Sequence, residues 1–212
     1  MKKRDLEIIL QKLPPHTAPM VKLEQYTTPA IIAADIVFNA YLEENINDKV
    51  VLDLGCGTGI FAIGAKLLGA REVIGIDADG TALTIAKGYA NTLSLDITFH
   101  ELDITEVTRS ILPKSGIDTI IQNPPFGAQK TAKGADRIFL KKALEFAKIV
   151  YSLHLTKTEK FITLLVNKLG GEIIWKKQYI FPINHIFHFH TQEKVDYDVS
   201  LFKIKSKLDK KV

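Results

Sequence analysis

The run Asn123-Pro124-Pro125-Phe126 combines residue types that suit alkylation of an amine conjugated to an aromatic ring. Such an amine is a poor nucleophile because its lone pair is delocalised, so a site must hold it in a chosen orientation. The Asn123 side-chain oxygen can accept one of its N–H groups and the Pro124 carbonyl the other, and proline fixes the direction of that carbonyl. Phe126 offers a flat face for stacking. The alternative interpretation is a turn that ends a strand, since Asn-Pro often begins turns.

A second group of candidate residues lies in VLDLGCGTG, residues 51–59, between a predicted strand and a predicted helix. Gly55, Gly57 and Gly59 allow a tight turn and the close approach of a ligand that a Cβ would repel. Their spacing differs from G-x-G-x-x-G, the dinucleotide fingerprint. Asp77 ends the next predicted strand, where a carboxylate can accept hydrogen bonds from both hydroxyls of a ribose. The pair predicts a nucleoside cofactor, and the alternative is a simple strand-to-helix turn.

Short apolar runs alternate with helical patterns along the chain. This alternation predicts an α/β fold with a mostly parallel sheet covered by helices on both faces. The predicted strands are 49–54, 72–77, 97–102, 117–122, 151–154, 172–181 and 195–205, the last two forming an antiparallel pair. The predicted helices are 3–13, 29–43, 59–68, 81–91, 135–150 and 158–169. Such sheets bind ligands beyond the carboxyl ends of their strands, where both candidate groups lie.

The composition is that of a globular protein, because 46% of the 212 residues are apolar and 25% are charged. The single cysteine, Cys56, excludes an internal disulfide and a cysteine zinc site, and it predicts a reducing, cytoplasmic compartment. Without a paired base, Cys56 is expected to contact a cofactor through its backbone rather than to act as a nucleophile. The N-terminal pattern is unlike a signal peptide, and no uncharged run of about 18 apolar residues is present to span a membrane.

Positive charge gathers in two segments, although the net charge is only +4. Residues 130–148 carry six basic and two acidic side chains, and residues 203–212 carry five lysines and one aspartate. Two such patches on an otherwise acidic body can contact phosphates. The alternative is a lysine surface that serves solubility.

Three histidines stand close together at His185, His188 and His190. In an extended segment His188 and His190 share one face, while His185 lies on the other. No carboxylate or cysteine nearby completes a ligand set. We therefore predict no metal site, and RNA contact or plain surface is the expected role.

The glycine loop and the acid after it resemble those of the class I S-adenosylmethionine-dependent methyltransferases, over residues 48–125 at least. The resemblance implies a Rossmann-like fold in which the three loop glycines follow the methionine part of the cofactor and Asp77 holds its ribose. It also implies that Asp103 contacts the adenine, with Ile104 beside it. The NPPF run is similar to the signature of amino-methyltransferases, which modify adenine N6, cytosine N4, guanine N2 or a glutamine side chain.

Further runs resemble the methyltransferase-like protein 5 family and its archaeal relatives. They are LEQYTTP at 23–29, NPPFG at 123–127, KGADRIFLKKALE at 133–145, VYSLH at 150–154 and KVDYDVSLFKI at 194–204. This resemblance implies N6-adenosine methylation of small-subunit rRNA, with Gln25 and Thr28 closing over the cofactor and Tyr26 alongside. Two positions depart from the family: Thr27, where proline is usual, and Leu155, where lysine is common.

The same resemblance implies a partner, because eukaryotic members work with a small zinc-binding activator protein. The predicted strand Ile97–Leu102 would be the outer edge of the sheet, where a partner can add a strand. The alternative is an edge protected by Asp96, His100 and Glu101.

We therefore predict a single methyltransferase domain, 1–212, with a seven-stranded sheet in a core over 48–212 and an N-terminal helical cap over 1–47. The expected reaction is methyl transfer from S-adenosyl-L-methionine to N6 of a flipped adenosine in structured RNA. The expected catalytic residues are Asn123, Pro124, Pro125 and Phe126. The expected cofactor-binding residues are Gln25, Tyr26, Thr28, Asp53, Gly55, Cys56, Gly57, Gly59, Asp77, Ala78, Asp103, Ile104 and Asn123. The expected RNA contacts are Lys130, Lys133, Arg137 and Lys141.

Three other functions stay open at this point. A guanine-N2 RNA methyltransferase would have the same fold, and a glutamine methyltransferase would act on a translation factor. The third is an RNA-binding scaffold with a vestigial pocket. It would predict damage to the glycine loop or to NPPF, and both runs are intact.

Overall fold

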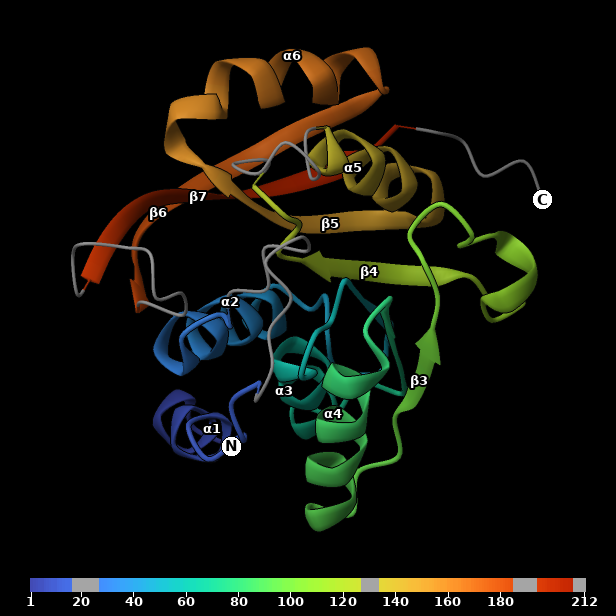
Figure 1. Cartoon of the computed structure of the whole chain (residues 1–212). Helices are drawn as coiled ribbons and strands as arrows, with labels where there is room; N and C mark the ends of the chain where they lie inside the picture. Colours follow the sequence, from blue (N-terminus) through green and yellow to red (C-terminus); the bar gives the residue numbers. More distant parts are fainter. Residues whose placement is uncertain (17–26, 127–133, 185–193, 208–212) are drawn as a thin grey trace.

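Seven strands form one mixed sheet in the computed structural model, in the order β3-β2-β1-β4-β5-β7-β6 (Figure 1). The structure describes residues 1–16, 27–126, 134–184 and 194–207. The strands are β1 Val50–Leu54, β2 Glu72–Asp77, β3 Thr98–Glu101, β4 Ile117–Gln122, β5 Ala147–Leu155, β6 Gly171–Asn184 and β7 Lys194–Ser206. β1 to β5 are parallel, and β7 runs antiparallel to both of its neighbours, β5 and β6. The predicted fold class is confirmed.

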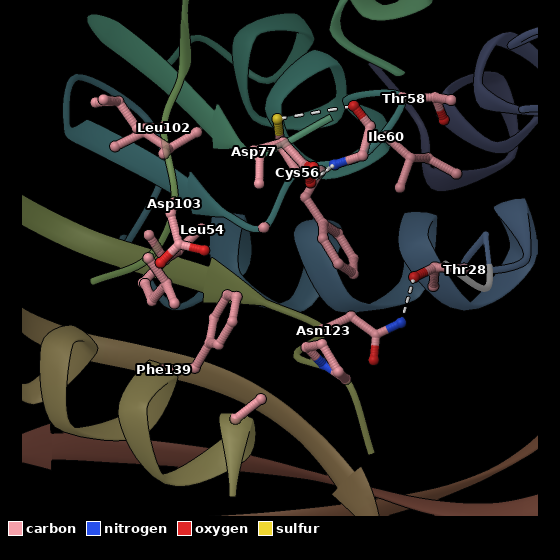
Figure 2. A pocket seen from close by; sticks show the side chains of 18 of the residues that line it. Thr28, Leu54, Cys56, Thr58, Ile60, Asp77, Leu102, Asp103, Asn123 and Phe139 are labelled. Atoms are coloured by element: carbon pink, nitrogen blue, oxygen red, sulfur yellow. Dashed lines mark hydrogen bonds between the residues drawn. The ribbon is translucent and has the colours of Figure 1, made fainter. Parts of the chain in front are cut away.

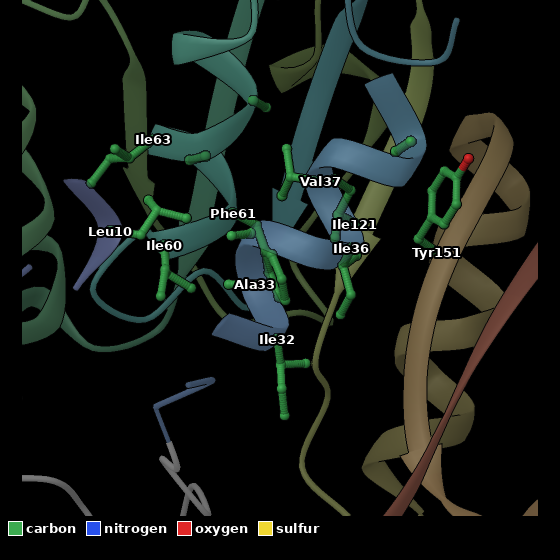
Figure 3. Packing of buried hydrophobic residues seen from close by; sticks show 14 of the residues in the cluster. Leu10, Ile32, Ala33, Ile36, Val37, Ile60, Phe61, Ile63, Ile121 and Tyr151 are labelled. Carbon is green, nitrogen blue, oxygen red and sulfur yellow. The ribbon is translucent and has the colours of Figure 1, made fainter. Parts of the chain in front are cut away.

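Helices cover both faces of this sheet. They are α1 Lys3–Leu10, α2 Ala30–Leu42, α3 Ile60–Leu67, α4 Gly80–Thr92, α5 Ala135–Phe146 and α6 Glu159–Lys168. Residues of α1, α2 and α3 pack on one face (Figure 3), and residues of α5 and α6 pack on the other. Val51 belongs to the first cluster and its neighbours Val50 and Leu52 to the second. Successive strand residues point to opposite faces, so two covered faces require an unbroken apolar strand.

Two predicted helices end earlier than expected. The first, expected over 3–13, ends at Leu10. The helix expected over 135–150 ends at Phe146, and β5 begins at Ala147. Ala147 has an extended backbone and pairs with Ile117 of β4. No glycine or proline marks the change, because pairing with β4, and not a local stop signal, ends the helix. Among the described residues, no helix is long and apolar enough to cross a membrane.

Two carboxylates of the α2 region, Asp35 and Glu43, tie the N-terminal helices to the C-terminal strands. Asp35 accepts hydrogen bonds from Lys3, Lys177 and Tyr179. Burial by itself would raise the pKa of Asp35, but the hydrogen bonds from Lys177, Lys3 and Tyr179 outweigh it and lower the pKa to about 2. Glu43, just after α2, accepts from Tyr151, Trp175 and Lys203 in a similar arrangement.

We expect Asp35→Asn to lower the free energy of unfolding at pH 7 by about 1 kcal/mol, since charge-assisted hydrogen bonds are lost. Because the folded pKa lies below the ordinary 3.8, this stability is present above about pH 4 and is lost as the pH falls toward 2. The free energies of unfolding of wild type and Asp35→Asn, measured by urea titration, should therefore converge as the pH falls across that range. Asp48→Asn, at an exposed pair with Arg71, is the matched control and should change little. A constant difference between Asp35→Asn and wild type at all pH values would contradict this assignment.

Candidate active site

A cavity of about 320 Å³ lies at the carboxyl ends of β1, β2 and β4 (Figure 2). Parallel sheets bind their ligands at this edge. Ten of the residues predicted from the sequence line it: Thr28, Gly55, Cys56, Gly57, Asp77, Ala78, Asp103, Ile104, Asn123 and Pro125. The fold therefore brings the glycine loop, the acid of β2 and the catalytic run to one space.

The glycine loop has a conformation that other residues rarely adopt. Gly55 has a φ of +74°, and a Cβ at this position would lie 2.8 Å from the Phe139 ring. Gly57 has a φ of +52°, and its N–H donates to the Asp77 carboxylate at 2.7 Å. Gly59 begins α3 with a φ of +84° and lies outside the cavity lining. The loop backbone is thus exposed to the cavity and held to the end of β2.

Two carboxylates of different character lie at the loop. Asp77 faces the cavity, and its oxygens accept from the Gly57 and Asp79 amides. Burial raises the pKa of Asp77 above its ordinary value. Asp53 lies outside the lining, is 1% exposed and accepts from the Ala62 amide at the start of α3. Burial, with the nearby charge of Asp77, raises the pKa of Asp53 to about 8. Burial thus favours the neutral form of Asp53, which reduces charge repulsion with Asp77.

Asn123 presents its side-chain oxygen as a free acceptor. Its Nδ2 donates to Thr28 Oγ1 at 3.1 Å, which leaves Oδ1 on the other side of the amide (Figure 2). Among the described residues this buried oxygen has no hydrogen-bond partner. An unpaired buried acceptor costs about 1–3 kcal/mol, so it calls for an explanation. A ligand N–H that enters the cavity would satisfy it.

The other members of the NPPF run directly follow Asn123 in the chain. Pro124 is buried and Pro125 lines the cavity. Phe126 is half-buried, and its ring meets that of Phe181 on β6 nearly at a right angle, with centroids 6.4 Å apart. Phe181 itself is fully buried.

A buried polar chain lies beside the catalytic run. Gln122, the last residue of β4, donates to Ser152 Oγ at 2.9 Å, and Ser152 Oγ lies 2.7 Å from His154 Nε2. Burial lowers the pKa of His154 to about 3, so the ring is neutral at physiological pH. Ser152 and His154 belong to the VYSLH run, which thus supports the strand that positions Asn123.

Several residues of the cavity were missed by the sequence analysis. Phe139 and Ile138 reach it from α5, and Leu102 follows β3. His16 lines it from the N-terminal segment, with Nε2 at 2.7 Å from Asp79 Oδ2 at the start of α4. The position of α5 directly after the NPPF run was a usable signal for Phe139. No sequence signal pairs His16 with Asp79.

Some predicted residues lie outside the described part of the chain. These are Gln25, Tyr26, Lys130, Lys133, His185, His188 and His190. Arg137 and Lys141 are described, and both are exposed on α5. Among the described residues, no group of three or more His, Cys, Asp or Glu side chains is arranged to hold a metal ion.

Comparison with known proteins places this geometry in a family. The family model of the methyltransferase small domain matches residues 33–157. An rRNA N6-adenosine-methyltransferase of Danio rerio, METTL5, is 36% identical over 96% of this chain and 98% of its own. This chain belongs to the METTL5 family. An uncharacterized Methanocaldococcus jannaschii protein, MJ0284, is 43% identical over 96% of this chain and 94% of its own. The crystal structure of Pyrococcus horikoshii PH1948, described as a candidate RNA methyltransferase, has a TM-score of 0.88 at 33% identity, covering 98% and 99% of the two chains.

The METTL5-family cofactor, S-adenosyl-L-methionine, fits this cavity. The side-chain-free backbone at Gly57, where no atom lies within 4 Å of the position of a Cβ, leaves room for a ligand to lie against the loop. The Asp77 carboxylate borders the same space and can accept from ribose hydroxyls, and Leu102 and Ile104 offer apolar surface beside Asp103. When bound, the cofactor supplies an electrophilic methyl group on sulfur.

We expect Thr28→Val to lower turnover of methyl transfer about tenfold, because the Asn123 amide loses the partner that sets its orientation. The Kd for S-adenosyl-L-methionine, measured by calorimetry, should stay within about twofold. Thr28→Ser keeps the hydroxyl and should restore turnover. Weaker cofactor binding with unchanged turnover would instead show that Thr28 contributes to cofactor binding alone.

We expect Asp77→Asn to weaken S-adenosyl-L-methionine binding about ten- to a hundredfold, since charge-assisted hydrogen bonds to the ribose are lost. Binding requires the ionised carboxylate, so wild-type affinity should fall as the pH drops toward the raised pKa of Asp77. Calorimetry at a series of decreasing pH values measures both effects. Asp103→Asn is the control for the pH dependence, because hydrogen bonds from Thr105 lower the pKa of Asp103 and keep it ionised. Equal affinity of Asp77→Asn and wild type would rule out this role.

Proposed function

We propose that this METTL5-family enzyme transfers a methyl group from S-adenosyl-L-methionine to N6 of an adenosine in structured RNA, most specifically small-subunit rRNA. The buried Oδ1 of Asn123 carries the proposal, because it borders the cofactor cavity and has no hydrogen-bond donor in the described part of the chain. The substrate class is supported by the relatives: the Danio rerio protein and a Drosophila melanogaster protein, 35% identical over 96% of this chain, are both rRNA N6-adenosine-methyltransferases.

In the proposed mechanism the chain acts mainly by orientation. Asn123 Oδ1 and the Pro124 carbonyl each accept one N–H of the amine, which turns the nitrogen lone pair toward the methyl group. Reaction then requires in-line geometry, and holding the two reactants in that geometry is the main catalytic term. No general base is needed, because the proton can leave the nitrogen after the transfer. The contact with Phe181 holds the plane of the Phe126 ring, and this ring is the proposed stacking surface for the flipped base.

The N-terminal residues 1–47 are proposed to act as a cap that closes over the cofactor. His16, Thr27 and Thr28 already line the cavity. The contact between His16 and Asp79 supports this role, because it holds the N-terminal segment to the start of α4. Gln25 and Tyr26, between these points, are proposed to complete the cap.

RNA is proposed to bind through basic side chains near α5. Arg137 and Lys141 are exposed there, and Lys130 and Lys133 precede the helix in the sequence. Contacts of this kind release counterions, so affinity should fall steeply with salt.

A zinc-binding activator protein is proposed to dock at β3. This strand stands at the end of the sheet and pairs with β2. An outer strand offers backbone groups to which a partner can add a strand. We further propose a cytoplasmic location, which rests on the single, buried cysteine.

We expect Asn123→Ala to abolish methyl transfer to rRNA while the Kd for S-adenosyl-L-methionine stays within about threefold, because the residue orients the amine rather than the cofactor. The substrate is unmodified small-subunit rRNA, the cofactor carries a labelled methyl group, and the product is identified after nucleoside digestion. Asn91→Ala, on the exposed side of α4, is the control and should behave as wild type.

The labelled nucleoside decides between the proposed substrates. Labelled N6-methyladenosine from the wild-type enzyme supports the proposal, whereas label in N2-methylguanosine would show that guanine, and not adenine, is the methylated base. Label in protein would show that the substrate is a glutamine side chain and not RNA. Turnover retained by Asn123→Ala would refute the mechanism. Label that forms only after the activator is added would support the proposed activator partner.

A further inference from the structure

Arg137 and Phe161 form a stacked pair at the active-site edge of the molecule. The Arg137 guanidinium carbon lies 4.7 Å from the centre of the Phe161 ring. Arg137 is in the first turn of α5 and Phe161 in the first turn of α6. Both helices lie over the same face of the sheet (Figure 1). Each follows a parallel strand and runs back along it, so both first turns lie at the carboxyl ends of β4 and β5, where the cavity opens.

The pair is placed and exposed in a way that packing alone does not explain. Phe161 is 37% exposed, and Arg137 makes no ion pair among the described residues. The next residue, Ile138, is 40% exposed and lines the cofactor cavity. An apolar and cationic surface therefore continues from the cavity rim onto the two helices.

A second arginine–phenylalanine pair in the chain shows what a structural pairing looks like. Arg109 lies over Phe146 with its guanidinium carbon 5.9 Å from the ring centre, but Phe146 is only 2% exposed. Arg109 also donates to the carbonyl of Glu145, at the opposite end of α5. The Arg109 guanidinium is therefore engaged by the fold itself, and the Phe146 ring is too buried to contact a ligand.

We infer that Arg137 and Phe161 form a stacking subsite for an unpaired nucleotide that flanks the target adenosine. Single-stranded RNA bases stack on aromatic rings and on guanidinium planes, and both are present here. Because Arg137 stacks through its face, its N–H edge is left to bind the adjacent phosphate. The inference rests on the proposed RNA substrate, and it adds a subsite outside the methyl-transfer cavity.

The test uses two fluorescently labelled RNA 12-mers, oligoadenylate and the same backbone with abasic sites, which carry equal numbers of phosphates. Fluorescence anisotropy measures their binding to the full-length protein with S-adenosyl-L-homocysteine present. Phe161→Ala and Phe161→Leu should each raise the Kd for oligoadenylate about tenfold and leave the abasic 12-mer unchanged. Phe161→Leu keeps an apolar side chain on α6, so it separates stacking from a folding defect.

The arginine variants separate charge from stacking. Arg137→Lys should bind the abasic 12-mer as wild type does but bind oligoadenylate more weakly, because the charge stays and the planar group is lost. Arg137→Ala should weaken both, whereas Arg109→Ala, the matched control, should weaken neither. Unchanged oligoadenylate binding by both Phe161 variants would overturn the inference, as would equal losses on both oligomers or a wild-type protein that does not distinguish them. Labelled methyl product from rRNA with the wild-type enzyme reports separately on the proposed function, so the two can fail independently.

Discussion

The hydrogen bond from Asn123 to Thr28 joins two parts of the chain that lie 95 positions apart, and the candidate chemistry depends on it. A carboxamide can turn over and exchange its oxygen with its nitrogen, and only one orientation offers an acceptor to an amine. Because Thr28 takes the Asn123 nitrogen, the oxygen is left for the cavity. Thr28 stands just before α2, so the orientation of the Asn123 side chain is set by the placement of an N-terminal helix.

The placement of α2 depends in turn on the C-terminal strands. Lys177 and Tyr179 of β6 bind Asp35 within α2, and Trp175 of β6 binds Glu43 just after it. The same strand carries Phe181, whose ring holds Phe126. β6 therefore contacts both the helix that orients Asn123 and the aromatic residue of the NPPF run. The antiparallel end of the sheet is a structural part of the active site, although it contributes little to the cavity wall.

Burial of the glycine loop controls its charge. Two ionised carboxylates close together in a poorly solvated site would repel each other, and burial, which raises the pKa of Asp53 to about 8, favours the neutral form of this side chain. A carboxyl group with a raised folded pKa makes a contribution to stability that falls as the pH rises from about 4 toward 8. Asp35, with its lowered pKa of about 2, has the opposite effect between about pH 2 and 4. Protonation of Asp35 thus lowers the stability of the fold at acid pH, and the burial of Asp53 lowers it at neutral pH.

The sequence by itself determined β2 and β4 to the residue, because both are short apolar runs with clear ends and lie buried between two helical layers. It also determined the glycine loop, the acid of β2 and the NPPF run, because each requires residue types with few substitutes. The end of α5 at Phe146 was decided by pairing of Ala147 with β4, which no local pattern encodes. The partner of Asn123, the contact between His16 and Asp79 and the stacking of Arg137 on Phe161 were likewise decided by tertiary structure. Each joins side chains from separate elements, and hydrophobic periodicity reports only on neighbours within one element.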